Sequence, residues 1–172
     1  MNMENPATYV LDTNVFIEAH RRYYSIDLCH GFWDCLTHYC QEPRLLSIDR
    51  VLAEIDEGDA LHQWVVNAPE ELFTSTADAD VVNWFGQMMT WVQASPQFRT
   101  EAKAKFAEDA DGWVIAYAKA KGFVVVTHEV FDPYAKKRVP MPNVCDQFDV
   151  PYVDTFEMLR ALEVKFGWAR EA

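Results

Sequence analysis

A short apolar run at residues 123–127, Phe-Val-Val-Val-Thr, constrains the fold more than any other part of the sequence. Its first four residues are all apolar instead of alternating with polar ones, which is typical of a parallel strand covered on both faces. The preceding segment, 110–121, carries no charge from Gly112 to Ala118 and stops at Gly122, so it predicts a helix buried on several sides. A buried helix that leads into a buried parallel strand indicates an α/β protein.

Other segments repeat this pattern of strand and helix. Further strands are predicted at 8–11 and 150–153, while 44–48 fits either a strand or the entry to a helix. Helices are predicted at 15–22, 31–39, 50–57, 61–66, 77–94, 100–107, 110–121 and 156–166, with caps at Thr13 or Asn14, Asp49, Asp109 and Thr155. We therefore expect a single domain over residues 1–172, with a mostly parallel central sheet and a helical insertion at about 58–107.

Composition excludes several classes of protein. Half of the 172 residues are hydrophobic, which is enough for a core and excludes disordered and fibrous chains. Fifteen basic and 27 acidic residues give a net charge of −12, which argues against a protein that coats nucleic acid but allows an enzyme that meets phosphate through a divalent cation. No apolar run approaches ~20 residues and residues 1–8 lack a signal-peptide pattern, so we expect no membrane segment and a cytoplasmic location.

The four cysteines, Cys29, Cys35, Cys40 and Cys145, form no Cys-x-x-Cys pair. In a reducing compartment we expect four thiols, most of them packed in the core. The alternative is a zinc site that adds His38 to the first three, although this spacing matches no usual zinc template.

Four acidic residues lie where the predicted fold would bring them together. In an open parallel sheet, ligands bind beyond the carboxyl ends of the strands. Asp12 directly follows the first predicted strand, and Glu129 follows the strand at 123–127 by two residues. Asp111 lies in the first turn of the buried helix, and Glu54 lies about one and a half turns into the helix at 50–57. Four separate segments would thus deliver carboxylates to one edge of the sheet.

Each acid also has a simpler explanation. The acid after the first strand could cap the next turn, Asp111 could complement a helix dipole, and Asp109 could be a cap. Glu54 lies in an acid-rich stretch that could form a solvated face, and Glu129 could be a turn residue. Together, however, clustered carboxylates would repel one another unless a hard cation such as Mg²⁺ or Mn²⁺ were bound. Two such ions ~4 Å apart support phosphodiester hydrolysis.

Three blocks of the sequence resemble those of PIN-domain nucleases. The first is Tyr-Val-Leu-Asp-Thr-Asn-Val-Phe-Ile at 9–17, and the second is 47–54, where a helix carries a glutamate. The third, 111–129, has an acid that opens a buried helix, a glycine stop and an apolar strand that ends in Thr-x-acid. Segments 29–40 and 58–107 match nothing in the family. The chain is longer than the compact toxins of the VapC type, which indicates a larger subfamily.

The resemblance implies a three-layer α/β/α fold and an Mg²⁺- or Mn²⁺-dependent endoribonuclease, frequently a toxin paired with a small antitoxin. The catalytic and metal-binding quartet of the family corresponds to Asp12, Glu54, Asp111 and Glu129. Glu129 departs from the family, which usually has Asp there. Asn14 matches a polar residue that hydrogen-bonds within the site, and Thr127 and Asp109 are expected to support it. The expected partners are RNA and an antitoxin protein, with a homodimer allowed.

Two other functions compete with this interpretation. A PIN-like chain that no longer cuts could act as a binding module through a protein partner. A phosphatase of the haloacid dehalogenase type would use Asp12 as a nucleophile, but it needs a second Asp where this chain has Asn14. A nuclease with this net charge would need a local basic rim, for which the candidates are Arg21, Arg22, Lys103, Lys105, Lys136, Lys137 and Arg138.

Overall fold

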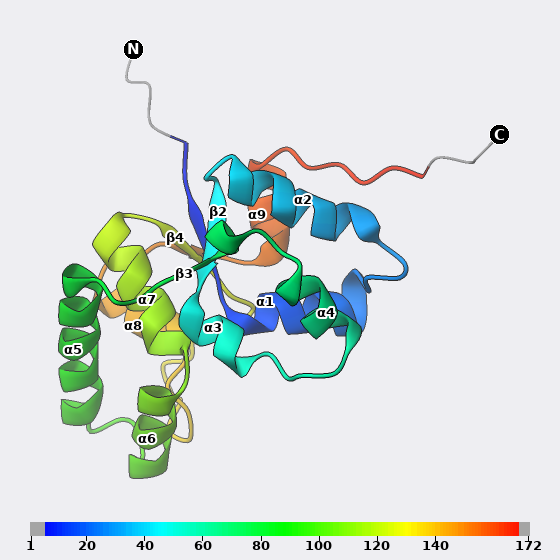
Figure 1. The fold of residues 1–172 in the computed structure, drawn as a ribbon. Coiled ribbons are helices and arrows are strands. Elements are labelled where there is room, and N and C mark those ends of the chain that lie inside the picture. The colour runs from blue at the N-terminus through cyan, green and yellow to red at the C-terminus, as the bar shows by residue number, and fades with distance from the viewer. Residues whose placement is uncertain (1–5, 169–172) are drawn as a thin grey trace.

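The computed structural model describes residues 6–168 and has five strands in one sheet, in the order β3-β2-β1-β4-β5 (Figure 1). All four strand pairings are parallel, as the sequence predicts. The strands are β1 (Tyr9–Leu11), β2 (Leu45–Ile48), β3 (Phe73–Thr74), β4 (Val124–Val126) and β5 (Tyr152–Val153). Their apolar side chains are buried on both faces in the central strands, where Val10 and Val125 have no exposed surface.

Helices cover the sheet on both sides, which confirms the predicted α/β architecture (Figure 1). One side carries α1 (Thr13–Glu18), α2 (His30–Gln41), α4 (Ala60–Val66) and α9 (Thr155–Ala161). The other carries α5 (Ala79–Ala94), α7 (Asp111–Lys121) and α8 (Met141–Gln147), while α3 (Asp49–Glu54) and α6 (Thr100–Glu108) lie near the carboxyl edge of the sheet. Helix α7 contacts β1, β4, α5 and α8, which explains its uncharged sequence. Gly122 ends it with a φ of 71°, as predicted.

The helix caps predicted at Thr155 and Asp49 are wrong. Asp154, one residue before the predicted cap Thr155, accepts a hydrogen bond from the amide of Glu157 at 2.8 Å, and the Glu157 carboxylate accepts one from the Asp154 amide at 2.9 Å. This reciprocal pair is a capping box at the start of α9. Asp49 opens α3, but its carboxylate accepts from the amide and hydroxyl of Thr76 instead of capping its own helix.

The sequence did not predict β3 or α8. Strand β3 has two residues and pairs with β2, so the segment predicted as a helical insertion at 58–107 also extends the sheet. Helix α8 begins after Pro140 and has Pro142 in its first turn, so its start was interpreted as part of a polar turn. It packs beneath α7 and brings the amide of Met141 toward the carboxyl edge of the sheet.

The cysteines are free thiols, as expected. Cys40 and Cys145 are buried, and Cys29 and Cys35 are half-buried. Burial raises the pKa of Cys35 and of Cys40 to about 11. The structure does not support the alternative zinc site, because within residues 6–168 no three His, Cys, Asp or Glu side chains are grouped to hold an ion.

In the part of the chain that the structure describes, no helix has both the length and the apolar character to span a bilayer. The absence of a signal peptide was predicted from residues 1–8, and residues 1–5 of that segment lie outside the described range.

Close packing around Gly112 holds the start of α7, and with it Asp111, in place. A Cβ atom at Gly112 would lie 3.0 Å from the Met89 Cε, 3.1 Å from a Phe85 ring carbon and 3.2 Å from a Phe106 ring carbon. Phe85 is stacked on Trp113 with ring centroids 3.8 Å apart, so its ring cannot easily move aside.

We expect Gly112→Ala to lower the free energy of unfolding by about 1–3 kcal/mol, because overpacking outweighs the better helix propensity of alanine. Gly86→Ala is the matched control, since Gly86 lies in the exposed part of α5 and its Cβ would meet nothing within 4 Å. That variant should gain up to about 1 kcal/mol. Urea denaturation of both variants measures the difference, and equal gains in stability would show that the Gly112 site has room.

Candidate functional site

A polar cavity of about 610 Å³ lies at the carboxyl edge of the sheet. Three of the four predicted acids line it, namely Glu54, Asp111 and Glu129. Asn14 and Asp109 also line it, at positions contributed by α1 and the turn before α7. The sequence therefore predicted the place and most of the acidic lining of this cavity.

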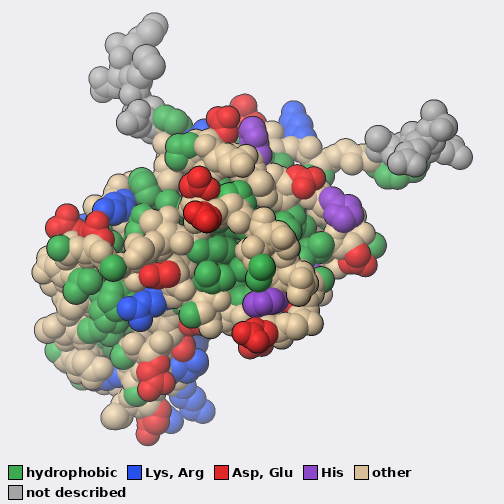
Figure 2. Space-filling view, viewed as in Figure 1, with side chains coloured by type: hydrophobic (Ala, Val, Ile, Leu, Met, Phe, Trp, Pro, Cys, Tyr) green, Lys and Arg blue, Asp and Glu red, His purple; other side chains and the backbone are tan. Residues whose placement is uncertain are grey.

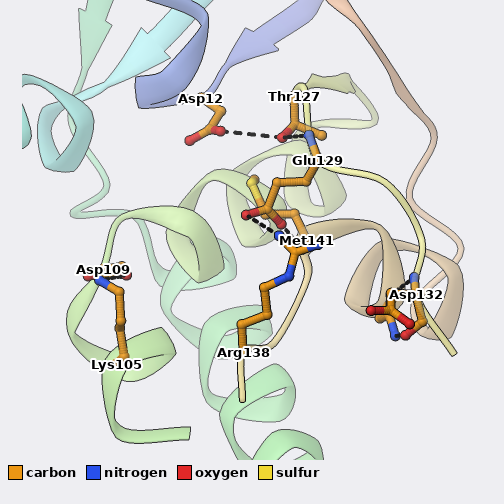
Figure 3. A network of polar contacts seen from close by, with 9 residues as sticks. Asp12, Lys105, Asp109, Thr127, Glu129, Asp132, Arg138 and Met141 are labelled. Carbon is orange, nitrogen blue, oxygen red and sulfur yellow. Dashed lines mark hydrogen bonds and ion pairs between the residues drawn. The ribbon is translucent and has the colours of Figure 1, made fainter. Parts of the chain in front are cut away.

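Asp12, the fourth predicted acid, is buried beside the cavity with 1% of its surface exposed. The register pairs Leu11 with Val126, so Asp12 and Thr127 leave adjacent strands side by side. The Thr127 hydroxyl donates to Oδ2 of Asp12 at 3.3 Å, whereas Oδ1 is buried without a hydrogen-bond partner (Figure 3). Asp12 also precedes α1, so the predicted cap at Thr13 or Asn14 is wrong.

Electrostatic coupling shows that these carboxylates share one local environment. Burial, followed by the charge of Glu129 and to a smaller extent that of Glu54, raises the pKa of Asp12 to about 7. Burial, followed by the charges of Asp12 and Glu129, raises the pKa of Asp111 to about 8. Like charges that are close together and poorly solvated explain both shifts.

Glu54 links three helices at the cavity wall. It is the last residue of α3, and its Oε1 accepts a hydrogen bond from the Ala110 amide at 2.7 Å. Its Oε2 accepts a hydrogen bond from the Thr13 hydroxyl. These bonds position the carboxylate between the start of α1 and the start of α7. No sequence pattern predicted the contact with Thr13 or the contact with Ala110.

Glu129 is held from the opposite wall, by the segment that leads from β4 to α8 (Figure 3). Its Oε2 accepts a hydrogen bond from the Met141 amide at 2.7 Å, and Nη1 of Arg138 lies 3.9 Å from Oε1. The Glu129 amide donates to the Thr127 hydroxyl at 3.2 Å. Thr127 therefore connects the Asp12 carboxylate to the backbone of Glu129.

Asp109 differs from its predicted role as the cap of α7. Ala110 is the N-cap residue of that helix, and Asp109 instead ends α6, where its carboxylate pairs with Lys105 at 2.7 Å (Figure 3). The charge of Asp109 is thus compensated, whereas within residues 6–168 no Lys, Arg or His nitrogen lies within 4.0 Å of the Asp12 or Asp111 carboxylate. Asn14 is exposed at the rim of the cavity.

Basic residues surround part of the cavity. Of the predicted rim, Lys105, Lys137 and Arg138 line it, whereas Arg21, Arg22, Lys103 and Lys136 do not. Arg22 instead pairs with Glu18 at 2.8 Å. The basic rim is therefore smaller than predicted and lies on the side of α6 and the segment before α8.

The chemistry of the cluster fits a hard divalent cation, although the side chains do not form a complete set of ligands as they lie. In residues 6–168 no three acidic, histidine or cysteine side chains are grouped around one point, because Glu54 and Glu129 turn toward backbone amides. The buried, unpartnered Oδ1 of Asp12 is the group that a cation would satisfy. Oxygen donors of this kind suit Mg²⁺ and Mn²⁺.

Comparison with known proteins gives a family and a fold. A family profile described as "Domain of unknown function (DUF4411)" matches residues 9–166, and no curated protein matches the sequence. The solved structure of VapBC2 from Rickettsia felis bound to a DNA fragment from their promoter has a similar fold, with a TM-score of 0.51 and 13% identity over 86% of this chain and 98% of that one. FitAcB from Neisseria gonorrhoeae gives a TM-score of 0.48 and 16% identity over 84% of this chain and 96% of that one. The likeness to VapBC2 confirms the predicted PIN-like fold.

Proposed function

This chain belongs to the DUF4411 family, and we propose that it is a ribonuclease that hydrolyses RNA phosphodiester bonds with the help of Mg²⁺ or Mn²⁺. One observation supports this most strongly: Asp12 is buried with an unpartnered carboxylate oxygen, beside a cavity to which three other segments contribute acids. If no ligand bound there, an uncharged side chain in place of the buried carboxylate would make the protein more stable, because buried like charges oppose folding. Carboxylates of this kind are typical of functional sites.

The residues of the cavity have distinct roles in the proposal. Asp12 and Asp111 would hold the cation, and Glu54 and Glu129 would complete the set when their carboxylates turn from the amides of Ala110 and Met141. When bound, Mg²⁺ or Mn²⁺ supplies an acidified water and offsets negative charge on the phosphate. Thr127 orients the Asp12 carboxylate through its hydroxyl.

The rim would orient the RNA. Lys105, Lys137 and Arg138 line the cavity and attract the phosphate backbone toward an otherwise acidic molecule. Arg138 lies within 3.9 Å of Glu129, so a phosphate that draws the guanidinium away would also free that carboxylate. Asn14, exposed at the rim, offers an amide that can donate to a phosphate or ribose oxygen.

We further propose a toxin role with a small antitoxin protein as partner. The shared fold with VapBC2, which was solved on a DNA fragment from their promoter, supports this extension, as does the sequence resemblance to VapC-type toxins. A second copy of the chain within such an assembly and a cytoplasmic location belong to the same proposal.

We expect the purified protein to cut labelled single-stranded RNA in millimolar Mg²⁺ or Mn²⁺ and to leave it intact in excess EDTA, because the carboxylates alone do not activate water. Gel analysis of the labelled RNA measures the cleavage. Adding back an excess of the ion should restore the activity, which distinguishes loss of the cofactor from loss of the fold.

One alternative function is compatible with part of the geometry. The hydrogen bonds of Glu54 and Glu129 to backbone amides would also suit a PIN-like binding module that has no ion. Such a protein would leave RNA uncut with every divalent ion. That result, for a folded sample, would overturn the ribonuclease proposal in favour of the binding module.

A further inference from the structure

Next to the acidic cavity, the segment 130–140 between β4 and α8 presents large apolar side chains to solvent. Tyr134 is 85% exposed, Val130 71% and Phe131 45%. Single exposed apolar residues are ordinary, but three within five positions of one loop make it a candidate ligand-binding segment. The site described above makes no use of them.

The backbone that carries these side chains is held firmly. The amide of Asp132 donates to Oδ1 of Asn143 at 3.0 Å, and Nδ2 of Asn143 donates back to the Asp132 carbonyl at 2.8 Å. From the connection between α5 and α6, Nε2 of Gln97 donates to the carbonyls of Pro133 and Ala135 at 3.2 and 3.0 Å. Tyr134, which lies between those two residues, is therefore presented from a preorganised loop, which lowers the entropic cost of binding.

A second cavity, of about 380 Å³, lies against this loop and continues from the acidic one. The two cavities share Lys137 and Arg138. The second is also lined by Tyr134 and by two further basic residues, Arg99 and Lys136. Among these four basic residues only Arg138 has a carboxylate within 4.0 Å, as judged from residues 6–168. Asp132 also lines this cavity. Within residues 6–168, however, Arg99, Lys136 and Lys137 have no carboxylate that close, and in a chain with a net charge of −12 three such cations indicate an anionic ligand.

Basic side chains are found near α6 on the visible face in Figure 2. Several Lys and Arg side chains lie, next to acidic ones, at the lower end of the molecule, where α6 lies in Figure 1. The acidic cavity and the loop at 130–140 meet α6 through Lys105 and through the bond from the Arg99 amide to the Lys136 carbonyl, which is 2.9 Å long. Apolar and basic groups thus occur together beside the acids.

We propose that the loop at 130–140 binds a single-stranded stretch of RNA next to the phosphate that is cut, with one base stacked on Tyr134 and neighbouring phosphates on Arg99, Lys136 and Lys137. The identity of the ligand rests on the proposed ribonuclease function. Aromatic side chains in a basic groove are how proteins commonly hold single strands, since every unpaired base offers a face for stacking. A duplex keeps its bases stacked on each other and offers no such face to Tyr134.

Binding in EDTA tests this inference without any cleavage. Fluorescence anisotropy of a labelled single-stranded RNA gives Kd, and quenching of 2-aminopurine placed in that strand reports stacking. We expect Tyr134→Ala to raise Kd about 5- to 100-fold and to remove the quenching, whereas Tyr134→Phe keeps both near the wild-type values. Replacing Lys136 and Lys137 together by Ala should reduce the salt dependence of log Kd by about 1.4, from ~0.7 per phosphate contact.

Trp168 provides a matched control. It is also 85% exposed, but it lies in the C-terminal segment, at the other end of the molecule from α6 (Figure 1). Trp168→Ala should bind as the wild type does, and Tyr134→Ala should leave affinity for a blunt duplex unchanged. Because Tyr134 is so exposed, its replacement should not affect folding, which the thermal midpoint verifies.

Failure of this inference is distinguishable from failure of the proposed function. If Tyr134→Ala binds single-stranded RNA as tightly as the wild type, or loses single strands and duplexes equally, the loop is not a stacking platform, even if the enzyme cuts RNA. If Tyr134 proves necessary for binding single strands but no ion induces cutting, the loop assignment stands and the ribonuclease proposal falls.

Discussion

Asp12→Asn is expected to reduce RNA cleavage by on the order of 100- to 1,000-fold or more while the protein stays folded. Asn keeps the size of the side chain and can still bond to the Thr127 hydroxyl, but it lacks the charge that would hold a cation. The unpartnered, buried Oδ1 is the atom whose ligand character is lost. Single-turnover cleavage of labelled RNA measures the rate, and circular dichroism verifies the fold.

The matched control for this variant is Asp109→Asn. Asp109 lines the same cavity, but its carboxylate pairs with Lys105 at 2.7 Å and is therefore committed to a partly exposed ion pair. Such pairs contribute little, so this variant should cleave within about threefold of the wild-type rate. Wild-type activity in Asp12→Asn, on RNA that the wild type cuts, would remove Asp12 from the site and the ribonuclease proposal with it.

The regular parts of the fold were predictable because they depend on local pattern. The apolar run at 123–127 and the αL residue Gly122 define β4 and the end of α7 without any knowledge of neighbours. Strand β3 was missed because a two-residue edge strand exists only through its pairing with β2. Asp49 was misassigned because a helix-opening acid looks the same whether it caps its own helix or bonds to Thr76, which is 27 positions away.

In the candidate site, too, some features follow from local sequence pattern and others depend on contacts between distant segments. That acids should gather at the carboxyl edge of the sheet follows from where strands and helices end, and the cavity is lined by Glu54, Asp111 and Glu129 as predicted. What the carboxylates contact depends on packing between distant segments. Glu54 bonds to the amide of Ala110, and Glu129 bonds to the amide of Met141, at the start of a helix that was not predicted.

A second large effect concerns pH and metal. Without divalent ions, the stability of the protein should fall as pH rises from about 4 to about 8. Asp12 and Asp111 have pKa values of about 7 and about 8 in the fold, above the ordinary value of 3.8. Between these limits the folded state keeps protons that the unfolded state has lost, so deprotonation favours unfolding, by at most about 1.4 kcal/mol per pH unit for each group.

Asp111→Asn isolates this contribution from all other titrating groups. The variant has no charge to bury at position 111 and relieves Asp12 of one repulsive neighbour, so its unfolding free energy should exceed that of the wild type at pH 8 by on the order of 2 kcal/mol. At pH 4 the two proteins should be nearly equal. Urea denaturation in EDTA across this range gives the difference, and a wild type that gains stability relative to Asp111→Asn as pH rises would contradict the assigned pKa shifts.

Divalent ions should reverse the trend in the wild type. Mg²⁺ or Mn²⁺ competes with protons for the same carboxylates, so the rise in thermal midpoint on adding millimolar ion should be large at pH 8 and nearly absent at pH 5. At 100 times its dissociation constant an ion that binds only the folded state adds about 2.7 kcal/mol. Sodium chloride at matched ionic strength controls for screening, and Asp12→Asn should lose most of the response. The negative charge that destabilises the ion-free protein at high pH is the same charge that a cation would bind. Equal midpoints with and without the ions at pH 8 would therefore mean that the carboxylates do not share a cation.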